Sequence, residues 1–315
     1  MALQLGPLGC SQPPRSLTVP ISNWPGYEYF YLAAERGLAG RAGLRLQTPQ
    51  FPDPQSIVHA YLRGELAVAP LTTVEAVDLC SRAPERCPVV VLVLDESRGG
   101  DQLLVRPGIT AIPQLRGRPV AVTPSSLGPF VLSRALEQHG MSLRDVTLTT
   151  MPLAAMPAAL ASGAVEAAAL FPPYSEQAHR QAGARRLFDS SRIPGEIFDI
   201  LVVDPKALPA LQQELPRLLR AWQAAHDLRR RDPDTAIAPM ARREMVSPQA
   251  FREAERGLVY FDLAQQRPLL AAGGPLERNL RAVQRVQRQL GLIRSGSPLP
   301  QVNAAPLEAA ITAPP

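Results

Sequence analysis

The strongest constraint on the fold is an alternation of short apolar runs with helix-like segments, which occurs twice along the chain. Alternating apolar and polar residues at 16–22 predict a strand, and the apolar spacing at 27–37 predicts a helix that ends at Gly37. The unbroken valine and leucine run at 89–94 is typical of a fully buried strand in a parallel sheet. The other elements predicted in this first series are strands at 44–48 and 65–70 and helices at 55–62 and 72–81.

A second series of the same kind begins near Arg118. Its predicted elements are strands at 118–123, 146–151 and 164–170 and helices at 130–139, 156–161 and 174–182. Because helices alternate with strands throughout, we expect an α/β protein of two lobes, each a mostly parallel sheet flanked by helices.

The C-terminal part has a different pattern. No strand is predicted after Pro205, and residues 215–228 and 275–290 have the spacing of amphipathic helices. After Arg294 the content of Ser, Pro and Ala rises, which predicts a Pro/Ala-rich tail that is disordered from Asn303 onward.

Composition excludes several classes of protein. With 315 residues, 46% of them apolar, the chain can form two domains with buried cores. No run reaches the ~18 apolar residues that a membrane-spanning helix needs. The net charge is +5, and every basic residue except Lys206 is an arginine, but these arginines are interspersed with Asp and Glu, so we expect no nucleic-acid interface. Three cysteines and four scattered histidines predict no metal site, and no cofactor is expected.

The cysteines leave two questions open. The residues around Cys10 (PLGCS at 7–11) look like the end of a bacterial lipoprotein signal, in which the cysteine is lipidated; the alternative is a stray thiol in a disordered tail. Cys80 and Cys87 lie between a predicted helix and a predicted strand, where they could close a small loop or remain two buried thiols.

Five motifs in order carry a resemblance to a known family. They are WPGY at 24–27, DESRGGD at 95–101, LRGRPVAV at 115–122, ALASGAVEA at 159–167 and SSRIPG at 190–195. Together they resemble the substrate-binding proteins of nitrate, sulfonate and taurine ABC importers, over about residues 16–290. The resemblance implies a two-lobe periplasmic-binding-protein type II-like fold that closes on a small solute and presents it to a membrane permease. It implies no catalytic residues.

The same resemblance implies a domain division and a location. Lobe 1 would comprise residues 16–101 and 205–293, and lobe 2 residues 102–204, with tails at 1–15 and 294–315. The chain would cross between the lobes near 102–106 and 199–204. We expect a monomer in the periplasm or the cell envelope, tethered through lipid if Cys10 is modified, with an inner-membrane ABC permease as partner.

Ligands of open α/β sheets bind in the loops that follow the strands. The candidate residues in these loops are Ser22, Asn23, Trp24, Tyr27, Thr72, Thr73, Asp95, Ser97, Ser125, Ser126, Phe171 and Tyr174. Each has a structural alternative: the hydroxyl residues could be helix caps, and the aromatic residues could be core. The charge of the solute stays open, because Arg98 and two helix N-termini favour an anion whereas Asp95, Glu96 and Asp101 favour a cation.

Three other classes of function remain as alternatives: an enzyme on the same fold, a regulator and a sensor. An enzyme related to thiamine pyrimidine synthesis would need a lysine and a reactive histidine in the site, but Lys206 and the histidines lie outside the predicted loops. A two-lobe enzyme of menaquinone synthesis is harder to exclude from sequence. The effector domain of a LysR-like regulator would follow a DNA-binding domain of roughly 60 residues, for which the first strand near Ser16 leaves no room. A sensor of the same solute cannot be separated from a transport protein by sequence.

Overall fold

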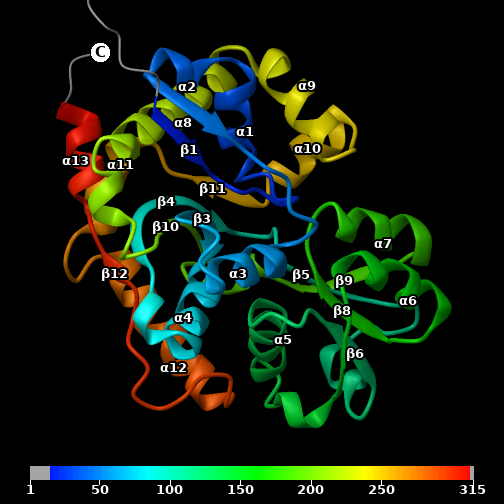
Figure 1. The fold of residues 1–315 in the computed structure, drawn as a ribbon. Coiled ribbons are helices and arrows are strands. Elements are labelled where there is room, and N and C mark those ends of the chain that lie inside the picture. The colour runs from blue at the N-terminus through cyan, green and yellow to red at the C-terminus, as the bar shows by residue number, and fades with distance from the viewer. Residues whose placement is uncertain (1–14, 313–315) are drawn as a thin grey trace, which may run out of the picture.

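The computed structural model describes residues 15–312, which form two lobes (Figure 1). Lobe 1 comprises residues 15–97 and 198–312, and lobe 2 comprises residues 102–189; the segments 98–101 and 190–197 connect them. Each lobe has its own five-stranded sheet with helices packed around it. The expected α/β class is therefore confirmed.

The sheet of lobe 1 has the strand order β11-β4-β10-β3, with β12 added alongside β4. Its strands are β3 (Val68–Thr72), β4 (Val89–Ser97), β10 (Phe198–Val203), β11 (Leu258–Tyr260) and β12 (Gln301–Val302). All residues of β4 are buried, as the valine and leucine run predicts. A separate parallel pair, β1 (Arg15–Thr18) and β2 (Leu44–Gln47), leads into the loop that carries Trp24.

Ten helices of the described chain belong to lobe 1. They are α1 (Glu28–Glu35), α2 (Leu38–Arg41), α3 (Pro54–Leu62), α4 (Thr73–Arg82), α8 (Glu214–Arg231), α9 (Pro233–Arg243), α10 (Pro248–Glu255), α11 (Leu263–Leu270), α12 (Pro275–Gln289) and α13 (Ala305–Thr312). Of these, α3 and α4 begin at the side of the lobe that faces lobe 2 (Figure 1). The start of these two helices therefore contributes to the space between the lobes.

The sheet of lobe 2 has the strand order β7-β6-β8-β5-β9. Its strands are β5 (Gln102–Val105), β6 (Pro119–Val122), β7 (Thr147–Thr150), β8 (Ala167–Leu170) and β9 (Arg185–Asp189), and its helices are α5 (Leu127–Glu137), α6 (Met156–Ser162) and α7 (Tyr174–Ala182). Strands β6, β7 and β8 are parallel to one another, which agrees with the alternating strands and helices of this region.

Strand direction differs from the prediction of mostly parallel sheets. In lobe 1, β10 is antiparallel to both β3 and β4, and in lobe 2, β5 is antiparallel to both β8 and β9. The reason is the path of the chain. Strands β5 and β10 start at the connections between the lobes and run away from them, whereas β4 and β8 run toward the cleft.

The C-terminal part also corrects the prediction. Strand β11 pairs with β4, although no strand is predicted after Pro205. The prediction of disorder from Asn303 onward is wrong for residues 305–312, which form α13 and pack against α8, and Gln301 and Val302 just before them pair with β4. Leu307 of α13 is fully buried. Strands of two or three residues carry no periodic pattern, so sequence reasoning had no signal for β11 or β12.

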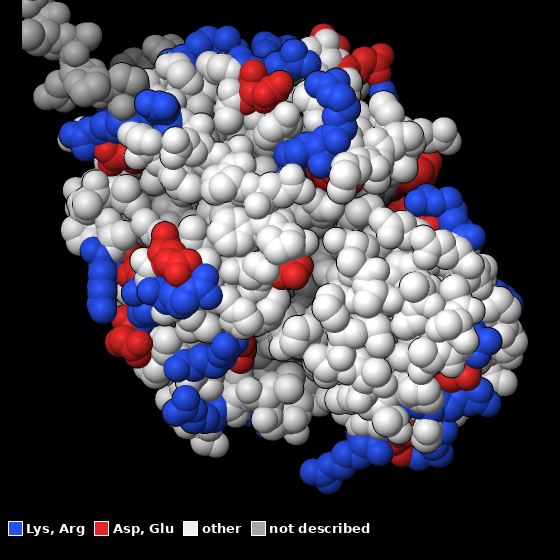
Figure 2. All heavy atoms as spheres, turned by 45° about the vertical axis from the view of Figure 1, so that its right-hand side comes forward, with Lys and Arg blue, Asp and Glu red and all other residues white. Residues whose placement is uncertain are grey.

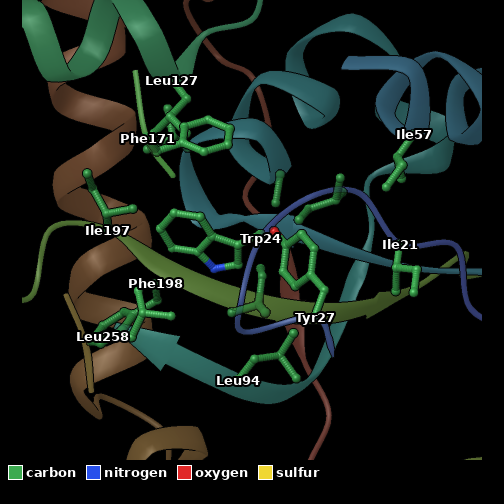
Figure 3. Close-up of a cluster of buried hydrophobic side chains, with 14 of the residues drawn as sticks. Ile21, Trp24, Tyr27, Ile57, Leu94, Leu127, Phe171, Ile197, Phe198 and Leu258 are labelled. Carbon is green, nitrogen blue, oxygen red and sulfur yellow. The ribbon is translucent and has the colours of Figure 1, made fainter. Parts of the chain in front are cut away.

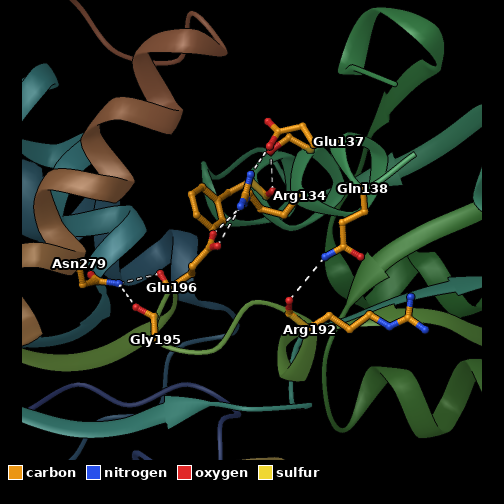
Figure 4. A network of polar contacts seen from close by, with 9 residues as sticks. Arg134, Glu137, Gln138, Arg192, Gly195, Glu196 and Asn279 are labelled. Atoms are coloured by element: carbon orange, nitrogen blue, oxygen red, sulfur yellow. Dashed lines mark hydrogen bonds and ion pairs between the residues drawn. The ribbon is translucent and has the colours of Figure 1, made fainter. Parts of the chain in front are cut away.

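Two features of the connections hold the lobes together. The hydroxyls of Ser97 and Ser190 lie 2.8 Å apart, and the Gly99 N–H donates to Ser190 Oγ at 2.7 Å. Figure 4 shows that residues of both lobes bind the connecting segment 190–197. Arg134 of α5, in lobe 2, donates to the Glu196 carboxylate at 2.7 and 2.9 Å, and Asn279 of α12, in lobe 1, donates to the backbone carbonyl of Glu196 at 2.9 Å.

The cysteines have distinct positions. Cys80, in the last turn of α4, forms a disulfide with Cys87, which lies shortly before β4, and their Cα atoms are 4.2 Å apart. Cys10 and its lipoprotein-like surroundings lie outside the described residues. Within residues 15–312, no helix is both long enough and apolar enough to cross a bilayer.

Candidate functional site

A cavity of about 220 Å³ lies between the lobes. Lobe 1 contributes the first turns of α3 and Glu75 of α4, and lobe 2 contributes the 123–128 loop, Leu153 and Phe171. Asp101 and Gln102, at the connection, line its floor. In Figure 2 the hollow between the lobes is bordered mainly by uncharged atoms with an acidic group beside it, whereas basic side chains lie over the outer parts of both lobes.

The cavity continues inward into a narrow space. Trp24, Tyr27, Thr72 and Asp199 of lobe 1 line this inner end, together with Glu75 and Asp101, which line both parts. The sheet explains why these groups meet: Asp199 on β10 is paired with Thr72 on β3 and with Asp95 on β4. One row of the sheet, nearest to lobe 2, therefore carries two carboxyl groups.

Aromatic side chains from both lobes meet at the inner end (Figure 3). The rings of Trp24 and Phe171 pack edge to face with centroids 5.4 Å apart, and Tyr174 packs against Phe171 at 6.5 Å. The Trp24 turn fits closely over the sheet, since a Cβ at Gly26 would lie 1.9 Å from Asp95 Oδ2. Glycine at position 26 therefore allows this turn to cover Asp95.

The hydrogen bonds of the acidic groups leave several oxygens without a partner. The Tyr27 hydroxyl donates to Asp199 Oδ1 at 2.5 Å, and Glu75 Oε2 accepts from the N–H and the hydroxyl of Thr72 at 3.0 and 2.9 Å. In contrast, Glu75 Oε1 is buried without a hydrogen bond, and Asp199 Oδ2 and both oxygens of Asp95 have none of good geometry, although the neighbouring Asp199 and Trp24 side chains lower the pKa of Asp95. Such groups normally have a partner, so the site is incomplete in the chain alone.

Burial raises the pKa of every carboxyl in this group. The pKa is raised to about 7 for Glu75 and Asp95 and to about 6 for Asp101, in each case chiefly because burial disfavours the charged form. Burial and then the nearby charge of Asp95 raise the pKa of Asp199 well above its usual range. A neighbouring cation would lower these pKa values, but no Lys or Arg is among the described residues that line the cavity.

The structure brings only some of the predicted site residues together. Trp24, Tyr27, Thr72, Ser125 and Phe171 line the cavity. Asp95 lies behind Trp24 and Gly26 rather than on the cavity surface.

The other candidates have structural surroundings away from the cavity lining. Asn23 accepts a hydrogen bond from Gln50, the Thr73 hydroxyl accepts from the N–H of Phe198, and the Ser126 hydroxyl donates to the carbonyl of Val74. Ser97 joins the connecting segments, Tyr174 packs behind Phe171, and Ser22 is fully buried next to the Trp24 turn.

Several lining residues were not among the sequence candidates. Glu75 and Asp199 are the most important, followed by Asp53, which caps α3, and the α3 residues Gln55 and His59. The Thr72-x-x-Glu75 spacing is the signature of a capping box, which explains Glu75 without a ligand. Asp199 directly precedes the apolar run at 200–203. An acidic residue next to a predicted buried strand is the signal that made Asp95 a candidate, and the same signal could have identified Asp199.

Two α/β lobes, joined by two chain segments and enclosing a solute-sized cavity, define the periplasmic-binding-protein fold. A model described as the NMT1-like family matches residues 11–243, so the chain belongs to that family. This result confirms the family resemblance found in the sequence.

Known proteins agree on the fold. A Brucella abortus protein provisionally named a binding protein is 22% identical over 220 residues, which cover 69% of this chain and 67% of that protein. The alkanesulfonate-binding protein SsuA of Xanthomonas axonopodis pv. citri, solved with MOPS bound, has a TM-score of 0.74 at 17% identity over 90% of this chain and 96% of its own. The desulfurization enzyme DSZB has a TM-score of 0.64 at 20% identity over 94% of this chain and 99% of its own. The fold therefore serves both binding proteins and an enzyme.

Proposed function

We propose that this protein is the extracytoplasmic solute-binding component of an ABC importer, which captures a small nitrogen- or sulfur-containing solute between its lobes. The observation that carries the proposal is the cavity lined from both lobes and from the connection. A solute that contacts both lobes favours the closed arrangement by its difference in affinity for the closed and open forms. The names of the Brucella and Xanthomonas proteins support a binding role.

Catalysis is the main alternative, because DSZB shares the fold. The described residues offer little for a covalent mechanism at the cavity. Their two cysteines, Cys80 and Cys87, are joined in a disulfide, and Lys206 is exposed outside the cavity. His59 lies at the rim, where its ring nitrogen is 2.7 Å from the Gln55 amide. These positions favour binding over an enzyme of the thiamine pyrimidine type.

A thermal-shift screen tests the solute-binding role. The full chain is titrated with taurine, alkanesulfonates, nitrate, bicarbonate, guanidine, polyamines and a hydroxymethylpyrimidine, and hits are verified by calorimetry. A ligand at about a thousand times its dissociation constant stabilises the native state by about 4 kcal/mol, so a true solute gives a plain shift. Small-angle X-ray scattering of the same samples is expected to show compaction. A screen without a saturable hit, or a hit that is turned over into product, would contradict the proposal.

The proposed location and partners follow from the same role. We expect a monomer that delivers its solute to an inner-membrane permease, and we propose that Cys10 carries a lipid. Detergent partitioning of the protein from its own cell envelope tests the anchor. The wild-type protein is expected in the detergent phase and the Cys10→Ser variant in the aqueous phase; equal partitioning would remove the anchor.

A further inference from the structure

The inner end of the cavity is formed by carboxyl groups that have no positive partner. Glu75, Asp101 and Asp199 line it with exposed fractions of 2%, 4% and 1%. Glu75 Oε1 and Asp199 Oδ2 are buried without any hydrogen bond. Because a buried carboxyl oxygen without a donor is costly, these two oxygens beside one space indicate that a donor comes from outside the chain.

The remaining surroundings on lobe 1 do not favour an anion. None of the described lining residues is Lys or Arg. Free N–H groups at the start of α3 or α4 could bind an anion, but side-chain caps already accept from N–H groups at both helix starts. The Asp53 carboxylate accepts from the Ser56 N–H at 2.7 Å, and Glu75 and Thr72 form a reciprocal capping box at the start of α4.

The rest of the cavity sets the size and shape of the ligand. Trp24 and Phe171 provide aromatic walls next to the carboxyl groups, and aromatic faces attract cations. A cavity of about 150 Å³ holds one benzene molecule, so about 220 Å³ holds a ring with a short substituent. On the lobe 2 side, α5 begins at Leu127 without a side-chain cap, and Leu127 lines both parts of the cavity, so the N–H groups there suit an acceptor atom of the ligand.

We propose that the solute carries a protonated nitrogen, an ammonium or an amidinium group, which binds between Glu75, Asp101 and Asp199 at the inner end of the cavity. This inference rests on the proposed solute-binding function and specifies its ligand. The N–H groups of the solute supply the donors that Glu75 Oε1 and Asp199 Oδ2 lack. The sulfonate-binding protein that shares the fold would then differ from this chain in the charge of its solute.

Binding of a cation is expected to release protons. Burial raises the pKa of Glu75 to about 7, so the free protein is partly protonated there at neutral pH. A cation binds the ionised form, so its affinity falls about tenfold for each pH unit below that value for one proton released. An anion would show the reverse dependence. The other titratable groups near Glu75 are Tyr27, Asp53, His59, Asp78, Asp95, Asp101 and Asp199.

A matched set of three probes tests the charge of the solute. Each probe has one aromatic ring of suitable size. Benzylamine carries a positive charge, phenylmethanesulfonate carries a negative charge, and 4-(aminomethyl)benzenesulfonate carries one of each. Calorimetry of the full chain at pH 5, 6, 7 and 8 gives the dissociation constant, and two buffers of different ionisation enthalpy give the number of protons released. We expect benzylamine to bind, more tightly toward pH 8 and with proton release.

Two variants link the result to the proposed residues. Glu75→Gln keeps an oxygen that can accept from the Thr72 N–H, because Gln also completes a capping box. It is expected to weaken benzylamine about 10- to 100-fold and to flatten the pH dependence. Glu85→Gln makes the same change of charge at an exposed position and is expected to leave binding unchanged.

The outcomes separate this inference from the proposed function. The proposal of a cationic solute is overturned if phenylmethanesulfonate is the only probe that binds, or if any ligand binds with higher affinity at pH 5 than at pH 8. The proposed solute-binding function would be unaffected by either result. Equal weakening by Glu75→Gln and Glu85→Gln removes the carboxyl cluster as the binding site. If neither these probes nor the broader screen bind, solute binding fails, and the inference fails with it.

Discussion

Glu75→Gln is expected to stabilise the ligand-free protein by an amount that grows as the pH rises from 4.5 to 7. The side chain is 2% exposed, and burial raises its pKa to about 7 from an ordinary value of 4.5. In the unfolded chain the carboxyl ionises near 4.5. The folded state therefore binds the proton more tightly between these values, and the contribution of protonated Glu75 to stability is complete below pH 4.5 and lost as the pH rises toward 7.

The magnitude follows from the two pKa values. Each pH unit between them is equivalent to 1.36 kcal/mol, so ionised Glu75 costs the folded state about 3 kcal/mol at pH 8 and less than about 1 kcal/mol at pH 5. Glutamine is neutral throughout and preserves the acceptor for the Thr72 N–H. The variant is therefore expected to exceed the wild type in free energy of unfolding by about 3 kcal/mol at pH 8.

Urea unfolding at pH 5, 6, 7 and 8, followed by tryptophan fluorescence, measures this difference. The slope of free energy against urea should be the same for both proteins, since the surface exposed on unfolding is unchanged. Glu85→Gln is the matched control, because that glutamate is exposed. A difference that stays constant with pH, or a variant that is less stable at pH 8, would refute the reasoning that burial of Glu75 is uncompensated.

Three further predictions concern the scaffold, each measured by urea unfolding. Reducing the Cys80–Cys87 disulfide is expected to lower the free energy of unfolding by about 2 to 3 kcal/mol, with no effect of reductant on a double alanine variant. Leu307→Ala is expected to lower the free energy of unfolding by about 2 to 5 kcal/mol, because the side chain is fully buried. An unchanged free energy of unfolding would indicate that residues 305–312 are a disordered tail. Arg243→Met is expected to cost about 3 to 5 kcal/mol, because Arg243 donates to buried Glu28 at 2.8 and 2.6 Å; a loss under about 1 kcal/mol would contradict this pairing.

Local sequence patterns predicted many elements of both lobes, but not β5, β9 and β10 or the helices α9, α10 and α11. The valine and leucine run at 89–94 lies within β4, and the predicted helix at 174–182 is α7. Such segments are predictable because their apolar residues repeat with the period of the element that buries them. The short strands β11 and β12 have no room for a period, and their pairing with β4 depends on a neighbour far away in the chain.

The sequence by itself determined the α/β class, the family and the aromatic residues Trp24 and Phe171 as candidates, because these depend on local pattern and motif order. Only the tertiary structure decided what surrounds the solute. Glu75, Asp101 and Asp199 come from three separate segments, and each has a local role as a cap, a connection or a strand residue. Their convergence follows from the crossing of β10 between β3 and β4. The charge of a site depends on which groups lie close together in space, and the sequence alone does not show which distant residues meet.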